Sequence, residues 1–150
     1  MGKAIVAGVG PIEGLGASLC AKFAEEGLHV IASGRTQSKL EKVVQRIESE
    51  GGSAEAFVAD STDEAATEAL FDKAGSELEL AIYNTGNNTP GRISDMTTEY
   101  FEQSWRVCCL GGFLFGREAV RRWKAAGHSG TLLFTGASAS LEAERISVPL

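Results

Sequence analysis

The sequence has few of the residues that carry metal, redox or disulfide chemistry. Its 150 residues include three cysteines and two histidines. The cysteines, Cys20, Cys108 and Cys109, are odd in number and show no C-x-x-C spacing, so we interpret them as small buried hydrophobic residues of a protein from a reducing compartment. The histidines, His29 and His128, lie far apart in the sequence, which predicts no metal site.

The sequence also lacks an excess of positive charge and any long apolar run. Lys and Arg number 14 against 20 Asp and Glu, which gives a net charge of −6 and an isoelectric point of about 5.0. This balance argues against nucleic acid or an anionic membrane surface as a partner. No run approaches the roughly 20 apolar residues that a membrane-spanning helix needs, and the N-terminus has no signal-peptide pattern. We therefore expect a cytoplasmic protein with a single domain, residues 1–150.

Glycine is abundant, with 18 residues, and short apolar runs alternate with amphipathic stretches. The expected strands are residues 3–9, 28–33, 54–59, 78–84 and 131–135. The expected helices are residues 14–26, 38–50, 63–74 and 98–126, with a loop at 85–94. Repeated strand–helix–strand units predict an α/β fold with a parallel sheet, helices on both faces and right-handed crossovers. Ligands of such sheets bind beyond the carboxyl ends of the strands.

Three glycines, Gly10, Gly14 and Gly16, stand between the first expected strand and the first expected helix. Glycine lets the backbone turn tightly and lets a phosphate approach the N–H groups at the start of a helix. This pattern favours a phosphate-binding turn, and the alternative is an ordinary glycine-rich loop.

Polar residues follow the second and third expected strands. Arg35 stands where an acid would bind the ribose of NAD, and its guanidinium suits the 2′-phosphate of NADP. The alternative for Arg35 is a solvated surface residue, and Glu13 in the glycine turn would repel an extra phosphate. Asp60 is a candidate acceptor for an adenine amine, or a cap for the next helix.

Together these positions resemble the short-chain dehydrogenase/reductase family, from Lys3 to about Leu141. The glycine motif of that family, T-G-x-x-x-G-x-G, corresponds to residues 9–16, with Val9 in place of Thr. Its Asp after the third strand corresponds to Asp60, and its N-N-A-G motif to residues 83–86, where two of the four residues are identical.

The resemblance implies a Rossmann-type doubly wound parallel sheet in the order 3-2-1-4-5, lacking the C-terminal strands and helices of the family. It implies NAD or NADP as hydride carrier and a small carbonyl or alcohol substrate, and Arg35 leads us to expect NADP(H) over NAD(H). The expected cofactor-binding residues are Gly10, Ile12, Glu13, Gly14, Leu15, Gly16, Arg35, Thr36, Asp60, Ser61, Asn84, Thr85 and Gly86.

The catalytic residues of the family are matched less well. The family's helix Asn, in its N-x-x-G pattern, falls on Cys109. Its Ser falls on Ala137 in an ungapped alignment, so Ser138 is the neighbouring catalytic candidate, and a Ser-rich capping loop is the alternative.

The Tyr and Lys of the family's Y-x-x-x-K motif have no counterpart. Neither tyrosine, Tyr83 or Tyr100, is followed by Lys at the fourth position, and the sequence ends at Leu150. Missing general acid–base catalysis costs roughly 10²–10⁴-fold. We therefore expect a cofactor-binding chain, C-terminally shortened or diverged, whose catalysis is impaired.

The helix expected at residues 98–126 carries a second hypothesis. Its residues at three- and four-residue spacing predict a face packed on the sheet: Phe101, Trp105, Cys108, Gly112, Phe115, Ala119 and Trp123. The resemblance also implies a homodimer through this helix. The alternative function is thus a non-catalytic pseudoenzyme or shortened isoform that associates with a full-length relative. A methyltransferase-type fold is a third hypothesis, and the absence of an acid after the second strand argues against it.

Overall fold

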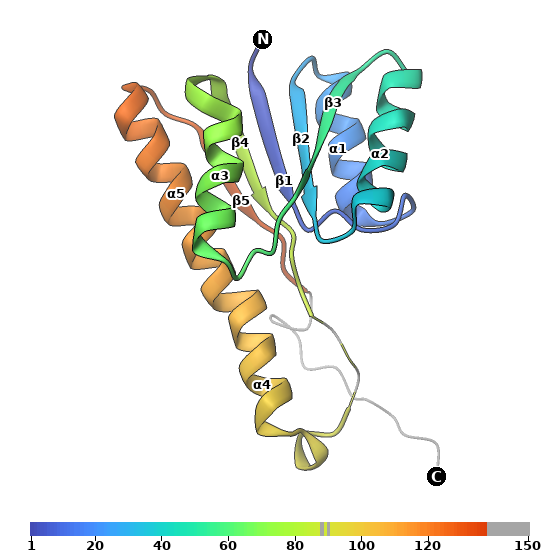
Figure 1. Ribbon diagram of the computed structural model, residues 1–150, viewed down its shortest axis with the longest axis vertical. Helices are drawn as coiled ribbons and strands as arrows, with labels where there is room; N and C mark the ends of the chain where they lie inside the picture. Colours follow the sequence, from blue (N-terminus) through green and yellow to red (C-terminus); the bar gives the residue numbers. More distant parts are fainter. Residues whose placement is uncertain (88, 90, 138–150) are drawn as a thin grey trace.

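In the computed structural model, the described residues 1–87, 89 and 91–137 contain one parallel sheet of five strands (Figure 1). The strands are β1 (Lys3–Ala7), β2 (His29–Gly34), β3 (Ser53–Val58), β4 (Leu78–Tyr83) and β5 (Thr131–Phe134). Their order across the sheet is β3-β2-β1-β4-β5, and every neighbouring pair is parallel. The predicted Rossmann-type fold and its strand order are confirmed.

The helices cover both faces of this sheet. They are α1 (Leu15–Glu25), α2 (Gln37–Ser49), α3 (Glu64–Ala74), α4 (Thr98–Trp105) and α5 (Gly111–Ala126), with short 3-10 turns at Gly75–Glu77 and Ile93–Asp95. Helices α1 and α2 lie on one face, and α3 and α5 on the other (Figure 1). Apart from the long helix, the predicted bounds differ from the observed ones by at most two residues.

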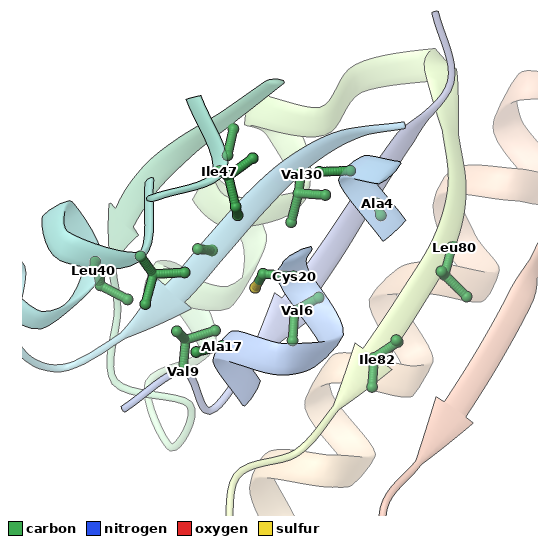
Figure 2. Packing of buried hydrophobic residues seen from close by; sticks show 14 residues of the cluster. Ala4, Val6, Val9, Ala17, Cys20, Val30, Leu40, Ile47, Leu80 and Ile82 are labelled. Atoms are coloured by element: carbon green, nitrogen blue, oxygen red, sulfur yellow. The ribbon is translucent and has the colours of Figure 1, made fainter. Parts of the chain in front are cut away.

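Small residues bring α1 close to the centre of the sheet. Its buried face consists of Gly16, Ala17, Cys20 and Ala24. Figure 2 shows Ala17 and Cys20 beside Val6 of β1 within the hydrophobic cluster on this face. Because both faces of β1 are covered, Ala4, Ile5 and Val6 are fully buried.

The helix predicted at residues 98–126 is interrupted. A π-helical segment, Arg106–Leu110, separates α4 from α5. The predicted packing face is correct for α5, where its members from Gly112 to Trp123 are buried, and wrong for α4, where Phe101 is 61% and Trp105 47% exposed. The reason is that α4 extends past the ends of the strands, so it has no sheet to pack against (Figure 1).

The cysteine prediction is correct only in part. Cys20 is buried under the sheet, and burial raises the pKa of its thiol to about 12. Cys108 and Cys109 are exposed, contrary to the prediction; both lie in the π-helical segment, on the sides of the helix that face away from the sheet core. In the part of the chain that the structure describes, no helix is long and apolar enough to cross a membrane.

Candidate functional site

The turn between β1 and α1 begins one residue after the strand. Gly8 has a φ of 88°, and the N–H groups of Gly8 and Val9 both donate to the Ser33 carbonyl, at 3.0 and 2.9 Å. A Cβ on Gly8 would lie 2.5 Å from the carbonyl carbon of Asn84. The tight bend therefore lies at Gly8, where the sequence analysis expected strand. The signal for it is a glycine that directly follows the apolar run of β1.

The predicted glycines of this turn differ in their surroundings. A Cβ on Gly16 would lie 2.7 Å from the Gly8 carbonyl oxygen and 3.0 Å from the Val9 Cα, so Gly16 lets α1 pack tightly on the strand. No protein atom lies within 4 Å of the position that a Cβ on Gly10 would take. Gly14 caps α1 and brings no side-chain acceptor, so the first-turn N–H groups of α1 have no capping side chain.

The other predicted residues of the first two turns lie at the same edge of the sheet. Ile12 is half-buried and packs against the hydrophobic cluster, whereas Glu13 and Leu15 are exposed. Thr36 caps α2 without a side-chain hydrogen bond. None of these residues lines the cleft described next.

A cleft of about 220 Å³ lies beyond the carboxyl ends of β2, β3 and β4. It brings together five residues predicted from three separate loops: Arg35, Asp60, Ser61, Thr85 and Gly86. Its other lining residues are Gly34, Ala59, Asn87, Gln103 and Val107. The last two come from α4 and the π-helical segment, and the sequence carries no signal that this part of the chain returns to the same edge.

Asp60 is held in the ionised form. Its Oδ1 accepts hydrogen bonds from the Thr62 backbone N–H at 2.8 Å and the Thr62 hydroxyl at 2.9 Å. The backbone bond from Thr62 is the largest cause of a lowered pKa of the carboxyl, and the charges of Arg35 and Arg106 lower it further. The capping role belongs to Asp63, which accepts from Ala66 N–H, so the alternative reading of Asp60 as a cap is wrong.

The end of β4 ties three strands together. The Asn84 side chain donates to the Gly8 carbonyl at 3.1 Å and accepts from the Thr135 hydroxyl at 2.9 Å. Asn84 therefore links the ends of β1, β4 and β5. The next residue, Thr85, has a buried hydroxyl oxygen for which the described residues supply no hydrogen-bond partner.

The catalytic candidates are only partly in view. Ser138 lies outside the described residues. Cys109 is exposed in the π-helical segment. Tyr100 is not a catalytic candidate, because no Lys follows it at the fourth position. Its hydroxyl bonds to the backbone of Thr89, and these bonds are the main cause of its lowered pKa.

Comparisons with known proteins point to one family. The family described as short chain dehydrogenase matches residues 3–148. The 2,3-dihydro-2,3-dihydroxybenzoate dehydrogenase of Bacillus subtilis is 30% identical over 134 residues, which are 87% of this chain and 51% of that protein. The chain thus spans about half the length of the curated relatives that it matches.

Solved structures share the fold. A short-chain dehydrogenase from Rhodopseudomonas palustris is 36% identical with a TM-score of 0.86, over 95% of this chain and 67% of that one. A 7α-hydroxysteroid dehydrogenase, solved in complex with NADH and 7-oxo glycochenodeoxycholic acid, is 25% identical with a TM-score of 0.85, over 95% of this chain and 56% of that one.

Proposed function

Because the chain belongs to the short-chain dehydrogenase family, we propose that it binds a nicotinamide dinucleotide at the carboxyl edge of its sheet, with NADP(H) preferred over NAD(H). The observation that carries this proposal is the cleft that Arg35, Asp60, Ser61, Thr85 and Gly86 line together. A cleft at this edge is where a doubly wound sheet binds its ligand.

The residues present fit such a cofactor. Gly10 leaves open space at the glycine turn, and the first-turn N–H groups of α1 suit a phosphate. The ionised Asp60 suits the amine of an adenine. The buried Thr85 hydroxyl oxygen has no hydrogen-bond partner among the described residues, and a ligand would supply one. The guanidinium of Arg35 suits a 2′-phosphate, and no acid stands beside it at the end of β2, although its charge also acts on Asp60 across the cleft.

The reaction is that of the family, and its rate in this chain is a separate proposal. When bound, the cofactor exchanges a hydride with the carbon of a small carbonyl or alcohol substrate. Within the 150 residues no tyrosine is followed by Lys at the fourth position. We therefore propose that these residues by themselves bind the cofactor and transfer hydride slowly.

A titration of the purified chain with NADPH and NADH, followed by nicotinamide fluorescence, tests the cofactor site. A charge-assisted hydrogen bond contributes about 1.5–3 kcal/mol, so Arg35→Ala should weaken NADPH binding by roughly 10–100-fold and leave NADH binding nearly unchanged. The control is Lys39→Ala, which removes an exposed cation from the same region. Equal losses for both cofactors would contradict the NADP preference, and a folded chain that binds neither would contradict the proposal.

The second candidate function, association through the long helix, rests on exposed apolar side chains. Phe101, Trp105, Phe113 and Val120 of α4 and α5 are all exposed. Acidic Glu99 and Glu102 lie on α4, and basic Arg121 and Lys124 on α5. An antiparallel pairing with a second copy would bring the acidic half of one helix against the basic half of the other.

Sedimentation velocity over a range of concentrations tests this association. Phe113→Glu should shift the equilibrium toward monomer, because it buries a charge in the contact. The matched control, Leu15→Glu, changes an equally exposed side chain on α1 and should leave the sedimentation unchanged. A wild-type chain that stays monomeric at every concentration rules out the pairing with a second copy.

A further inference from the structure

The hydrogen bonding of the π-helical segment is displaced by one residue. The Gly111 N–H donates to the Arg106 carbonyl. In an α-helix it would donate to the carbonyl four residues back, which belongs to Val107. The Val107 carbonyl has thus lost its α-helical donor. Interruptions of this kind occur frequently at functional sites.

A residue of the sheet replaces that donor. The hydroxyl of Tyr83, the last residue of β4, donates to the Val107 carbonyl at 2.5 Å. The ring is 3% exposed and packs against Phe115, with 5.4 Å between the ring centroids. Burial raises the pKa of Tyr83, so its phenol keeps the proton that this bond needs.

The helix leaves room for this hydroxyl at Gly111, which has no side chain. A Cβ on Gly111 would overlap the Tyr83 hydroxyl oxygen and would lie 2.9 Å from the Ser61 carbonyl oxygen. Any side chain at position 111 would therefore push the helix away from both β4 and the β3–α3 loop. Tyr83 and Gly111 fit each other as a pair.

The bond joins three parts of the cleft. Val107 and Gln103 are the helical wall, Ser61 belongs to the wall after β3, and Thr85 follows Tyr83 by two residues. We propose that Tyr83 is a positioning residue for the cofactor, which holds the helix interruption open and thereby places Val107 and Gln103 against the cleft. This inference rests on the proposed function of the cleft.

Loss of the hydroxyl should let the helix close. With the Tyr83 bond gone, the Gly111 N–H can return to the Val107 carbonyl. A π-helical turn holds about one residue more than an α-helical turn, and each residue of an α-helix advances by about 100°. A return from π-helical to α-helical bonding therefore turns α4 by roughly that angle relative to α5. Gln103 and Val107 would then leave the cleft wall.

Tyr83→Phe tests the inference because it removes a single oxygen. Fluorescence titration should show roughly tenfold weaker binding of both NADPH and NADH, in contrast to the NADPH-selective loss expected for Arg35→Ala. The control is Tyr100→Phe, which removes the other phenol and should bind as the wild type does. Cofactor binding by the wild type is measured first, since a wild type that binds neither cofactor overturns the proposed function itself.

A second readout reports the helix directly. Scalar couplings across hydrogen bonds, measured by NMR on the labelled chain, should join the Gly111 nitrogen to the Arg106 carbonyl in the wild type and to the Val107 carbonyl in Tyr83→Phe. An unchanged acceptor in the variant, or a changed acceptor with unchanged affinity, overturns the inference. Gly111→Ala, which displaces the hydroxyl from the other side, decides the question where Tyr83→Phe does not fold, and it should lose affinity for both cofactors alike.

Discussion

At the scale of single residues, the glycines of the β1–α1 turn serve two different purposes. Gly8 and Gly16 are required by the protein itself, because a positive φ and a close helix–strand contact leave no room for a side chain. Gly10 meets nothing within 4 Å. The space next to Gly10 is therefore available to a ligand.

Alanine substitutions should separate these two purposes. Gly16→Ala places a Cβ 2.7 Å from the Gly8 carbonyl oxygen, and overpacking of this kind costs about 1–3 kcal/mol. Gly10→Ala should change the free energy of unfolding by less than about 0.5 kcal/mol. Urea unfolding of both variants gives the two values, and a Gly10→Ala variant as unstable as Gly16→Ala would contradict this assignment.

His128 predicts a pH dependence of stability. Its two ring nitrogens lie 2.9 Å from the carbonyl oxygens of Ser129 and Ser76. Carbonyls only accept, so both bonds exist together only when both nitrogens carry protons. The bond to Ser129, followed by that to Ser76, raises the pKa of His128 above its usual 6.5.

Because the pKa of His128 is raised in the folded state, His128 stabilises the fold at low pH. The stabilisation by His128 is complete below pH 6.5 and is lost as the pH rises through the folded-state value. The melting temperature of the wild type should therefore fall more between pH 6 and pH 8.5 than that of His128→Gln. Parallel curves for the two proteins, measured by circular dichroism, would speak against this role.

At the scale of elements, side chains tie the edge strand β3 to its neighbours. His29 of β2 bonds to Ser53 at 2.7 Å and to Glu55 at 3.2 Å, and Lys73 of α3 lies 2.9 Å from the other Glu55 oxygen. Burial opposes ionisation of Glu55, but the hydrogen bonds from Lys73 and His29 together outweigh it and lower its pKa.

Glu55→Gln should weaken this edge. A lowered carboxyl pKa stabilises the fold above the unfolded value near 4.5, and this contribution is lost as the pH falls through the folded value. The variant should lose about 0.5–1 kcal/mol at pH 7 and show a shallower decline on acidification. Urea unfolding at pH 7 and pH 4 measures both effects. Glu50→Gln, which breaks an exposed pair with Arg46, is the control and should lose less.

The sequence predicts the elements well where local pattern decides them. The apolar periodicity of α2, with Leu40, Val43 and Ile47 buried, is sufficient to place that helix. The interruption at Arg106–Leu110 has no such signal, because its residues suit a helix of either kind. The bond that we propose holds it open joins Tyr83 to Val107, which are 24 positions apart in the sequence.

The same limit applies to the candidate site. Arg35, Asp60 and Thr85 follow strands, so their place at one edge follows from the parallel sheet. Gln103 and Val107 reach the cleft through the course of α4 past the strands and through the bond of Val107 to Tyr83, and no local sequence pattern predicts either feature.

At the scale of the whole molecule, the strands at the centre of the sheet are better paired and more deeply buried than β5 at its edge. Strand β1 pairs on both sides and is covered on both faces, whereas β5 carries exposed Leu133 and Phe134 and, in the described part of the chain, pairs only with β4. The free energy of local opening differs from one part of a fold to another, and it is lowest where pairing and burial are least.

Amide hydrogen exchange should follow this gradient. The amides of β1 and β2 should exchange slowest and those of β5 fastest, because opening β5 exposes little buried surface. Mass spectrometry of peptides from residues 1–8, 28–34 and 129–136 gives the comparison. Equal protection of β5 and β1 would contradict this gradient.

The central place of β1 also bears on how the chain assembles during synthesis. Among the described strands, β1 is translated first, β2 and β3 then extend the sheet on one side of it, and β4 and β5 extend it on the other side. Each later strand finds an edge already built by earlier ones. The unit β1–α1–β2–α2–β3 is complete once Val58 has emerged, so a nascent chain can bury its first core before the second half of the sheet has been translated.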